Sequence, residues 1–271
     1  MKSLQLKVLS VVASALAVVG VVVAPQAAAA ERNLVAFGDS VLADPDAGSY
    51  FAHRFDPSKV AGVDCPTSNN YAKRAGAKLR LPVRDFSCSG AVSMSPGPQV
   101  SQQVDAAIRS GALSPATNRV VITTGFNDTY NHRDMNLPQI RKQFADRTAP
   151  QVERIKRAAP NARVQIVGYP TIGTGPYYCL FHFGPRPADS TFLPGIQDFE
   201  NKAQWMQVDL AARTGVQFLD MKPSTRNNGM CADANQRMWA GLVDFSAGDG
   251  NLPIHMNQRG HEHAANVIAR S

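Results

Sequence analysis

Residues 34–45 read LVAFGDSVLADP and combine a short apolar run with a Gly-Asp-Ser turn. A run of this length, bounded by turn residues, is typical of a buried β-strand. In an open parallel sheet, ligands bind beyond the carboxyl ends of the strands, and Ser40 would lie at such an end. The stretch therefore predicts that Ser40 is presented at a sheet edge, although Gly-Asp-Ser alone is also common in ordinary turns.

Four later runs repeat the strand pattern: VRDFSC from 83, RVVITTG from 119, RVQIVGYP from 163 and VQFLDM from 216. Helical spacing occupies the segments between and after them, at 71–79, 139–159, 198–213 and 258–269. In the third of these helices we expect four apolar residues to pack against the sheet: Trp205, Met206, Val208 and Leu210. The alternation of strand and helix predicts an α/β fold with a parallel sheet covered on both faces.

The N-terminus has the features of a secretory signal peptide. Lys2 and Lys7 precede an apolar run at 8–24, and small residues lead up to an expected cleavage after Ala30. A membrane anchor is the alternative, but the run is at the short end of the roughly 17–25 residues that span a bilayer. We expect a secreted domain at 31–271 with no stable membrane span.

Charge and cysteine content bear on the binding partners of the protein and on the compartment in which it works. Without the two leader lysines the formal net charge falls from +7 to +5, and the scattered Lys and Arg residues do not indicate a nucleic acid partner. An even number of cysteines in an exported chain favours disulfides, with three pairings open and no metal-binding spacing: Cys65, Cys88, Cys179 and Cys231. A Cys179–Cys231 bridge would join two long irregular connections, 171–197 and 222–256.

Polar residues at the ends of the predicted strands supply the parts of an acyl-transfer site. Gly90 follows the second strand, Asn127 and Asp128 follow the third, and His255 precedes the last helix. A serine hydroxyl needs a base to remove its proton, and His255 is the candidate for Ser40. The backbone N–H groups of Ser40 and Gly90, with the Asn127 amide, are candidate donors to an oxyanion. Asp128 alone is interpreted as a turn cap.

These residues lie in four blocks in order: FGDSV from 37, CSGA from 88, GFND from 125 and IHMNQRGHEHAA from 254. The blocks resemble those of the GDSL or SGNH hydrolase family, and CPTSNNYAKRAGAKL followed by FSCSGA resembles its secreted actinobacterial esterase and lipase group. The resemblance implies a flavodoxin-like, three-layer α/β/α sandwich with a five-stranded parallel sheet. It implies ester hydrolysis without a metal or other cofactor, with Ser40, Gly90, Asn127 and His255 in the roles above. It also implies the pairings Cys65–Cys88 and Cys179–Cys231.

Two positions depart from the family pattern. Phe126 replaces the second glycine of the third block, which places a bulky side chain near the site. Leu252 stands where the family usually has the aspartate that orients the catalytic histidine. Some members of the group use a main-chain carbonyl instead, so Leu252 or Pro253 is favoured as the acceptor from His255, with the Asp249 carboxylate as the competing partner.

The leading hypothesis is a secreted serine esterase or lipase that cleaves a lipid or small acyl ester through an acyl-serine intermediate. Alternatives are a carbohydrate O-deacetylase or acyltransferase on the same residues, and a catalytically silent lipid-binding or cell-wall-binding protein. The aromatic-rich stretch GPYYCLFHFGP at 175–185 favours an apolar acyl group. We expect a monomer in which His261 and His263, on the last helix, pack or face solvent rather than bind a ligand.

Overall fold

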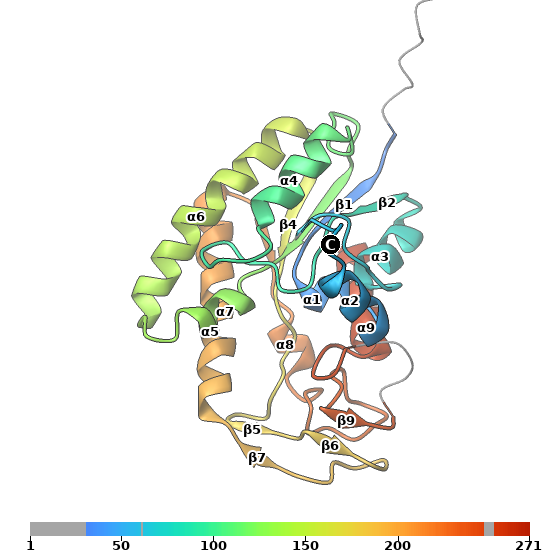
Figure 1. The fold of residues 1–271 in the computed structure, drawn as a ribbon, viewed down its shortest axis with the longest axis vertical. Coiled ribbons are helices and arrows are strands. Elements are labelled where there is room, and N and C mark those ends of the chain that lie inside the picture. Colours follow the sequence, from blue (N-terminus) through green and yellow to red (C-terminus); the bar gives the residue numbers. More distant parts are fainter. Residues whose placement is uncertain (1–30, 61, 247–251) are drawn as a thin grey trace, which may run out of the picture.

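Five parallel strands form the central sheet of the computed structural model, which describes residues 31–60, 62–246 and 252–271 (Figure 1). In spatial order they are β2 (Val83–Asp85), β1 (Leu34–Gly38), β3 (Arg119–Thr123), β4 (Arg163–Val167) and β8 (Gln217–Leu219). Each coincides with one of the five predicted runs. The predicted α/β class and five-stranded parallel sheet are confirmed.

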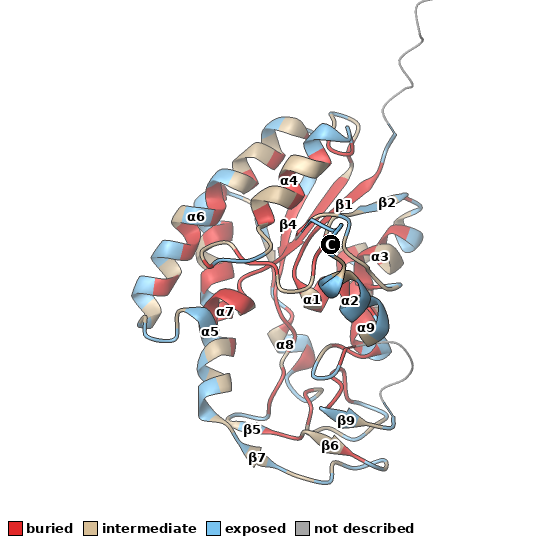
Figure 2. Ribbon diagram, viewed as in Figure 1, coloured by how far each residue is buried: buried red, intermediate tan, exposed pale blue. Residues whose placement is uncertain are grey.

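Helices cover both faces of the sheet. On one face lie α3 (Tyr71–Leu79) and α9 (Gln258–Arg270), and on the other α4 (Val100–Arg109), α6 (Leu137–Ala158) and α7 (Pro194–Thr214) (Figure 1). Successive residues of β1 enter different cores, with Leu34 and Ala36 in one cluster and Val35 and Phe37 in the other. This alternation is the period-2 geometry of a strand buried on both sides. Figure 2 shows the buried residues concentrated along the sheet.

The predicted helices differ from those of the structure in number and length, and one side chain lies on a different face from the one predicted. α7 begins at Pro194, four residues before the predicted start, and α4 was not predicted. Met206 and Leu210 are fully buried as expected, but Trp205 is 45% exposed, so its predicted packing on the sheet is wrong. The ring instead lies on the outer side of α7, where the Arg141 guanidinium stands 5.1 Å from the ring centroid.

The two connections expected to be irregular contain short paired strands below the main sheet (Figure 1). The antiparallel pair consists of β5 (Tyr177–Tyr178) and β7 (Thr191–Phe192), and the parallel pair of β6 (Phe181–His182) and β9 (Val243–Asp244). The short helix α8 (Lys222–Thr225) precedes β9. A disulfide between Cys179 and Cys231 joins the two connections, and a second links Cys65 to Cys88. Both pairings are those that the family resemblance implied.

Short helices follow the carboxyl ends of two strands: α1 (Ser40–Ala43) and then α2 (Ala47–Phe55) after β1, and α5 (Phe126–Asn131) after β3. Gly38 lets the ends of these two strands come together, because a Cβ there would lie only 2.3 Å from the Thr123 carbonyl oxygen. Among the described residues, no helix combines the length and hydropathy needed to span a bilayer.

Candidate active site

Ser40 is the first residue of α1 and directly follows β1. Asp39 caps the helix, and its Oδ1 accepts the Val41 N–H at 3.0 Å. The first amides of a helix have no acceptor within it, so the Ser40 N–H is left to bind another group. The strand-to-helix turn thus presents both the hydroxyl and the amide of Ser40 at the edge of the sheet.

His255 reaches Ser40 from the loop before α9. Its Nε2 lies 2.7 Å from Ser40 Oγ, and its Nδ1 lies 2.8 Å from the Pro253 carbonyl oxygen. Burial lowers the pKa of His255 below its ordinary value of 6.5, and the hydrogen bond to Pro253 opposes this shift only in part. A neutral imidazole that donates Nδ1–H to Pro253 directs the Nε2 lone pair at the serine hydroxyl, which is the arrangement of a general base.

The alternative partners of His255 are placed differently. A further carboxylate of the same connection, that of Asp244, is committed elsewhere, because both of its oxygens lie 2.9 Å from Arg237 Nη2. Asp249 lies outside the described residues, and Leu252 is buried beside the site. Among the described residues, the acceptor in contact with His255 Nδ1 is therefore the Pro253 carbonyl oxygen.

Gly90 and Asn127 stand beside Ser40. Gly90 has φ +81° with open space where a Cβ would be, so the left-handed backbone, rather than crowding, favours glycine there. Asn127 Nδ2 donates to the Ala91 carbonyl at 2.9 Å, and its Oδ1 accepts from Tyr130 Oη at 3.0 Å. These bonds fix the amide and use one of its two N–H groups. The other is available to an oxyanion.

The sequence matches the family model described as the GDSL-like Lipase/Acylhydrolase family over residues 36–263. The chain belongs to this family. It is accordingly a carboxylic ester hydrolase. No curated protein sequence matches it.

Solved structures share the fold of this GDSL hydrolase. Phospholipase A1 from Streptomyces albidoflavus NA297 is 19% identical with a TM-score of 0.56, over 88% of this chain and 99% of that one. Est24, a carbohydrate acetylesterase from Sinorhizobium meliloti, is 17% identical with a TM-score of 0.52, over 89% and 97%. The lipase/acylhydrolase from Enterococcus faecalis is 14% identical with a TM-score of 0.51, over 88% and 94%.

Two carboxyl groups hold the turns of the GDSL hydrolase site together. Tyr169 Oη donates to Asp39 Oδ2 at 2.5 Å and accepts the Phe126 N–H at 3.0 Å, which links the turn after β1 to the turn after β3. Burial raises the pKa of Asp39 to about 7, against the hydrogen bonds from Tyr169 and Val41. Sequence reasoning missed Tyr169, although it is the last residue but one of the quoted run RVQIVGYP.

Asp128 does more than cap a turn. Its buried carboxylate accepts the backbone N–H groups of Ser93, Met94 and Ser95 at 2.8–3.1 Å, together with the Ser95 hydroxyl at 2.9 Å. Three such bonds fix the loop that follows Gly90. The carboxylate therefore sets the position of the Gly90 backbone relative to Asn127.

His261 is a second histidine with hydrogen-bonding partners close to its ring, and it is fully buried. Its Nδ1 accepts the Tyr71 N–H at 3.2 Å, and its Nε2 lies 2.9 Å from Asp44 Oδ2. Ser68 Oγ donates to the same carboxylate oxygen at 3.2 Å. The sequence expectation of a packing histidine holds for His261, but its carboxylate partner was missed, although Asp44 lies in the opening stretch 34–45.

Ser40, Gly90, Asn127 and His255 line one cavity of about 540 Å³, in the size range typical of small-molecule sites. Phe126 forms part of its wall, and packs edge-on against Tyr169. Most of the remaining wall is apolar and comes from the two connections joined by Cys179–Cys231: Ile172, Tyr178, Leu180, Leu193, Met230, Trp239, Leu242, Leu252 and Ile254.

Proposed function

We propose that this GDSL hydrolase is an exported serine esterase or lipase that cleaves esters of apolar acyl chains through Ser40. The observation that carries the proposal is the 2.7 Å contact between His255 Nε2 and Ser40 Oγ inside an apolar cavity. A nucleophile, a base and an acyl-sized space are thereby available to one substrate carbonyl.

In the proposed reaction, His255 Nε2 takes the hydroxyl proton while Ser40 Oγ attacks the ester carbonyl carbon. The oxyanion accepts hydrogen bonds from the N–H groups of Ser40 and Gly90 and from the Asn127 amide. When the tetrahedral intermediate collapses, the carbon–oxygen bond to the alcohol breaks, and His255 returns the proton to the departing oxygen. Water then attacks the acyl-serine with His255 again as the base, which releases the acid and restores Ser40.

We assign the orientation of His255 to the Pro253 carbonyl. A carbonyl oxygen selects the tautomer with the proton on Nδ1, as a triad carboxylate would. It is uncharged, however, and stabilises the imidazolium formed during attack less than a carboxylate does. The site would operate as a Ser-His dyad supported by the backbone.

Export is proposed from two features. The leader at 1–30, which lies outside the described residues, would be removed to leave the catalytic domain at 31–271. Both cysteine pairs form disulfides, which persist in oxidising compartments.

The cavity wall favours an apolar acyl group over a sugar. Most of the side chains that line the cavity are apolar, whereas carbohydrate recognition needs several directed hydrogen bonds. We therefore place a carbohydrate deacetylase second and a catalytically silent protein third.

A panel of p-nitrophenyl esters from acetyl to palmitoyl tests the proposal on residues 31–271. We expect kcat/KM to rise from acetyl to chains of intermediate length, a fluorophosphonate to label Ser40, and Ser40→Ala to lose about three or more orders of magnitude in activity. Labelling at another residue with activity surviving in the variant would disprove the assignment of Ser40. A preference for acetylated sugars over every p-nitrophenyl ester would favour the deacetylase.

A further inference from the structure

Large apolar side chains are exposed around the mouth of the active-site cavity. Six of them make up what we call the apolar rim: Phe51 and Phe55 on α2, and Phe183, Leu242, Phe245 and Ile254 on the two connections that supply most of the cavity wall. Leu242 and Ile254 also line the cavity, so the rim is continuous with its wall. Exposed apolar patches of this kind mark interaction surfaces on soluble proteins.

The first side of the rim is a helix that contributes nothing to the core. All nine residues of α2 are described and none is buried, as its colour in Figure 2 shows. Phe51 is 53% exposed and Phe55 76%, and their rings stack with centroids 6.0 Å apart. Tyr50 packs against Phe51 and lines the cavity, so this helix joins the exposed aromatic rings to the mouth.

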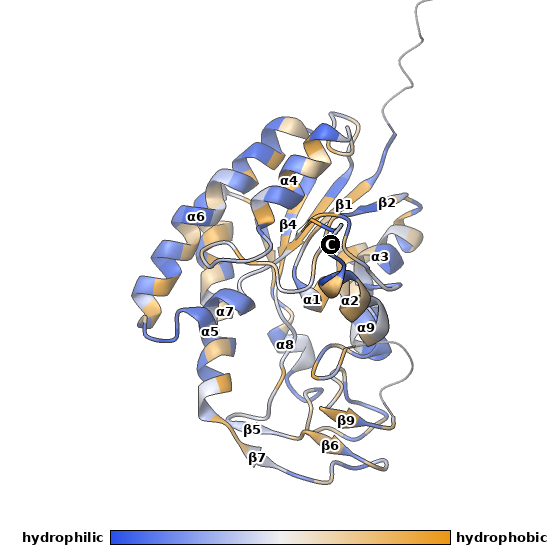
Figure 3. Ribbon diagram, in the orientation of Figure 1, coloured by the Kyte–Doolittle hydropathy of each residue, from blue (hydrophilic) through white to orange (hydrophobic). Residues whose placement is uncertain are grey.

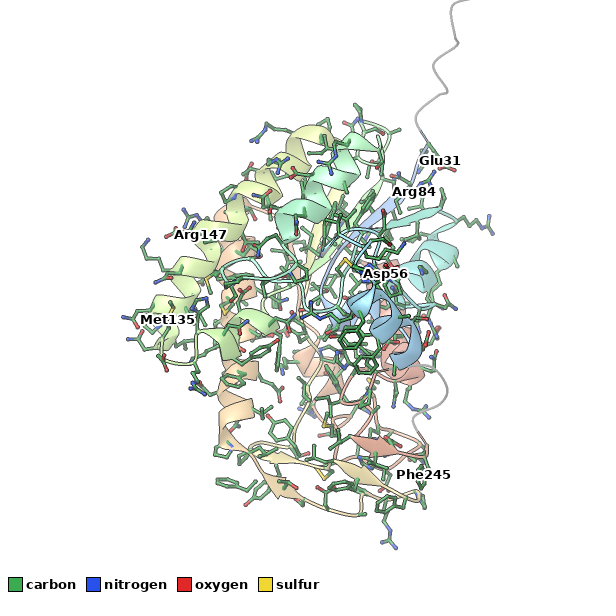
Figure 4. All side chains as sticks on the ribbon, viewed as in Figure 1. Glu31, Asp56, Arg84, Met135, Arg147 and Phe245 are labelled. Atoms are coloured by element: carbon green, nitrogen blue, oxygen red, sulfur yellow. A yellow bond between two sulfur atoms is a disulfide. The ribbon has the colours of Figure 1, made fainter. Side chains whose placement is uncertain are left out.

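The second side stands on the pairing of β6 with β9, which Figure 3 colours as hydrophobic in part, because Phe181 pairs with Val243 and His182 with Asp244. Phe245 is 78% exposed and lies at the edge of the molecule beside β9 (Figure 4). Its ring packs against Phe183 with centroids 5.7 Å apart. Beneath them, the buried Arg237–Asp244 ion pair fixes the end of β9. The exposed rings are thus held by a buried framework.

The charges beside α2 identify the kind of surface that the rim fits. Along residues 46–59, Arg54 and Lys59 are balanced by Asp46 and Asp56. A protein or nucleic acid partner recognised by charge would require an imbalance here. An uncharged aromatic surface around an opening instead matches the interfacial region of a lipid layer, where aromatic rings insert readily.

We propose that the apolar rim docks the hydrolase on a lipid surface, with the cavity mouth facing the acyl chains. The inference rests on the proposed function, because an ester with an apolar chain would then enter the cavity without crossing water. Binding would be driven by burial of the rim rather than by charge, so it should occur on zwitterionic lipid and survive added salt.

Cosedimentation with phosphatidylcholine vesicles tests the docking. The parent is residues 31–271 carrying Ser40→Ala, which removes hydrolysis, and it should partition onto the vesicles equally at low salt and at high salt. Phe51→Ser with Phe55→Ser, and separately Phe245→Ser, should each weaken partition by about tenfold or more. The matched control is Trp205→Gln, which removes an exposed aromatic ring on α7 away from the mouth and should leave partition within about twofold.

In a second set of experiments Ser40 is restored. Hydrolysis of a soluble short-chain p-nitrophenyl ester is then measured, together with the oligomeric state of each protein. The rim variants should hydrolyse this ester within about twofold of the parent, because none of the three phenylalanines lines the cavity. The docking is refuted if the parent does not bind the vesicles, or if the rim variants bind as well as the Trp205→Gln control. It is also refuted if the parent is a dimer that the rim variants dissociate, since the rim would then be a contact between two copies. If the protein with Ser40 binds the vesicles but does not hydrolyse the ester, the proposed function is contradicted and the docking is not.

Discussion

His255, in the loop before α9, and His261, in the first turn of that helix, have opposite kinds of partner. His255 donates to a backbone carbonyl at 2.8 Å and faces a serine, whereas His261, six residues later, faces a buried carboxylate at 2.9 Å and accepts a backbone N–H. The carboxylate that a catalytic triad would contain is thus present in the molecule, but beside the histidine that does not touch Ser40.

The difference follows from what each position must do. His261 accepts the Tyr71 N–H at Nδ1 and faces Asp44 with Nε2, so it is a structural link between α3, α1 and α9. In the proposed reaction His255 needs an unprotonated Nε2, and the Pro253 carbonyl favours this state by accepting a hydrogen bond from Nδ1–H. Asp44 still acts on His255 at a distance, because its charge raises the pKa that burial lowers.

Replacing each histidine with alanine gives the largest contrast. His255→Ala should lower kcat by about 10³–10⁴ with the fold retained, since the base for Ser40 is lost. His261→Ala should instead leave a buried carboxylate without its imidazole and lower the free energy of unfolding by about 2–4 kcal/mol. Turnover of a p-nitrophenyl ester and urea unfolding, measured on both variants, check the pair. Equal losses of turnover per folded molecule would break the distinction.

Within the described part of the chain Asn127, like His255, is held without a carboxylate partner: a backbone carbonyl and a tyrosine hydroxyl fix its side-chain amide. Asn127→Ala should lower kcat by about 10²–10³ with little change in KM or stability, because one donor to the oxyanion is lost. The matched control is Asn131→Ala, on the same short helix. An effect confined to KM would mark Asn127 as a substrate-positioning residue.

Asp44→Asn tests how strongly the carboxylate beside His261 influences the pKa of His255. In the parent, the pKa of His255 lies below 6.5, so the acid limb of kcat/KM should lie below pH 6.5. The Asp44 charge raises that pKa, so its removal should move the limb to still lower pH and reduce kcat by about three- to tenfold. The exposed Asp46→Asn is the control and should leave the limb in place. A shift of the Asp44→Asn limb toward higher pH would contradict this account.

Asp249→Asn should have the smallest effect. If the Pro253 carbonyl orients His255, kcat should stay within about tenfold of the parent, whereas amide replacement of a true triad aspartate can cost about 10⁴. Steady-state turnover separates the two cases, with the Asp46→Asn protein again as the reference. A decrease in kcat of several thousandfold would indicate that the Asp249 carboxylate orients His255. Both histidines would then have a carboxylate partner.

Local sequence patterns determined the sheet and the family. The three central strands β1, β3 and β4 are short, mostly apolar runs bounded by turn residues, as burial on both faces requires, whereas the edge strands β2 and β8 are more exposed. The blocks containing Ser40, Gly90, Asn127 and His255 could be recognised because each lies within a few residues of chain. The helix α4 escaped prediction, and Trp205 was assigned to the wrong side of α7, because periodicity identifies an apolar residue without fixing the face that meets the sheet.

Contacts between distant residues were decided only by the tertiary structure. The sequence left Leu252, Pro253 and Asp249 open as partners of His255, and the contact with the Pro253 carbonyl appears only in the folded loop, because the loop's conformation sets where each carbonyl points. Tyr169 with Asp39, Asp128 with residues 93–95, and His261 with Asp44 are pairs separated by 33 or more residues, so no local pattern brings them together. Side-chain hydrogen bonds of this kind depend on a fraction of an ångström in the packing of elements, which one strand or helix cannot specify alone.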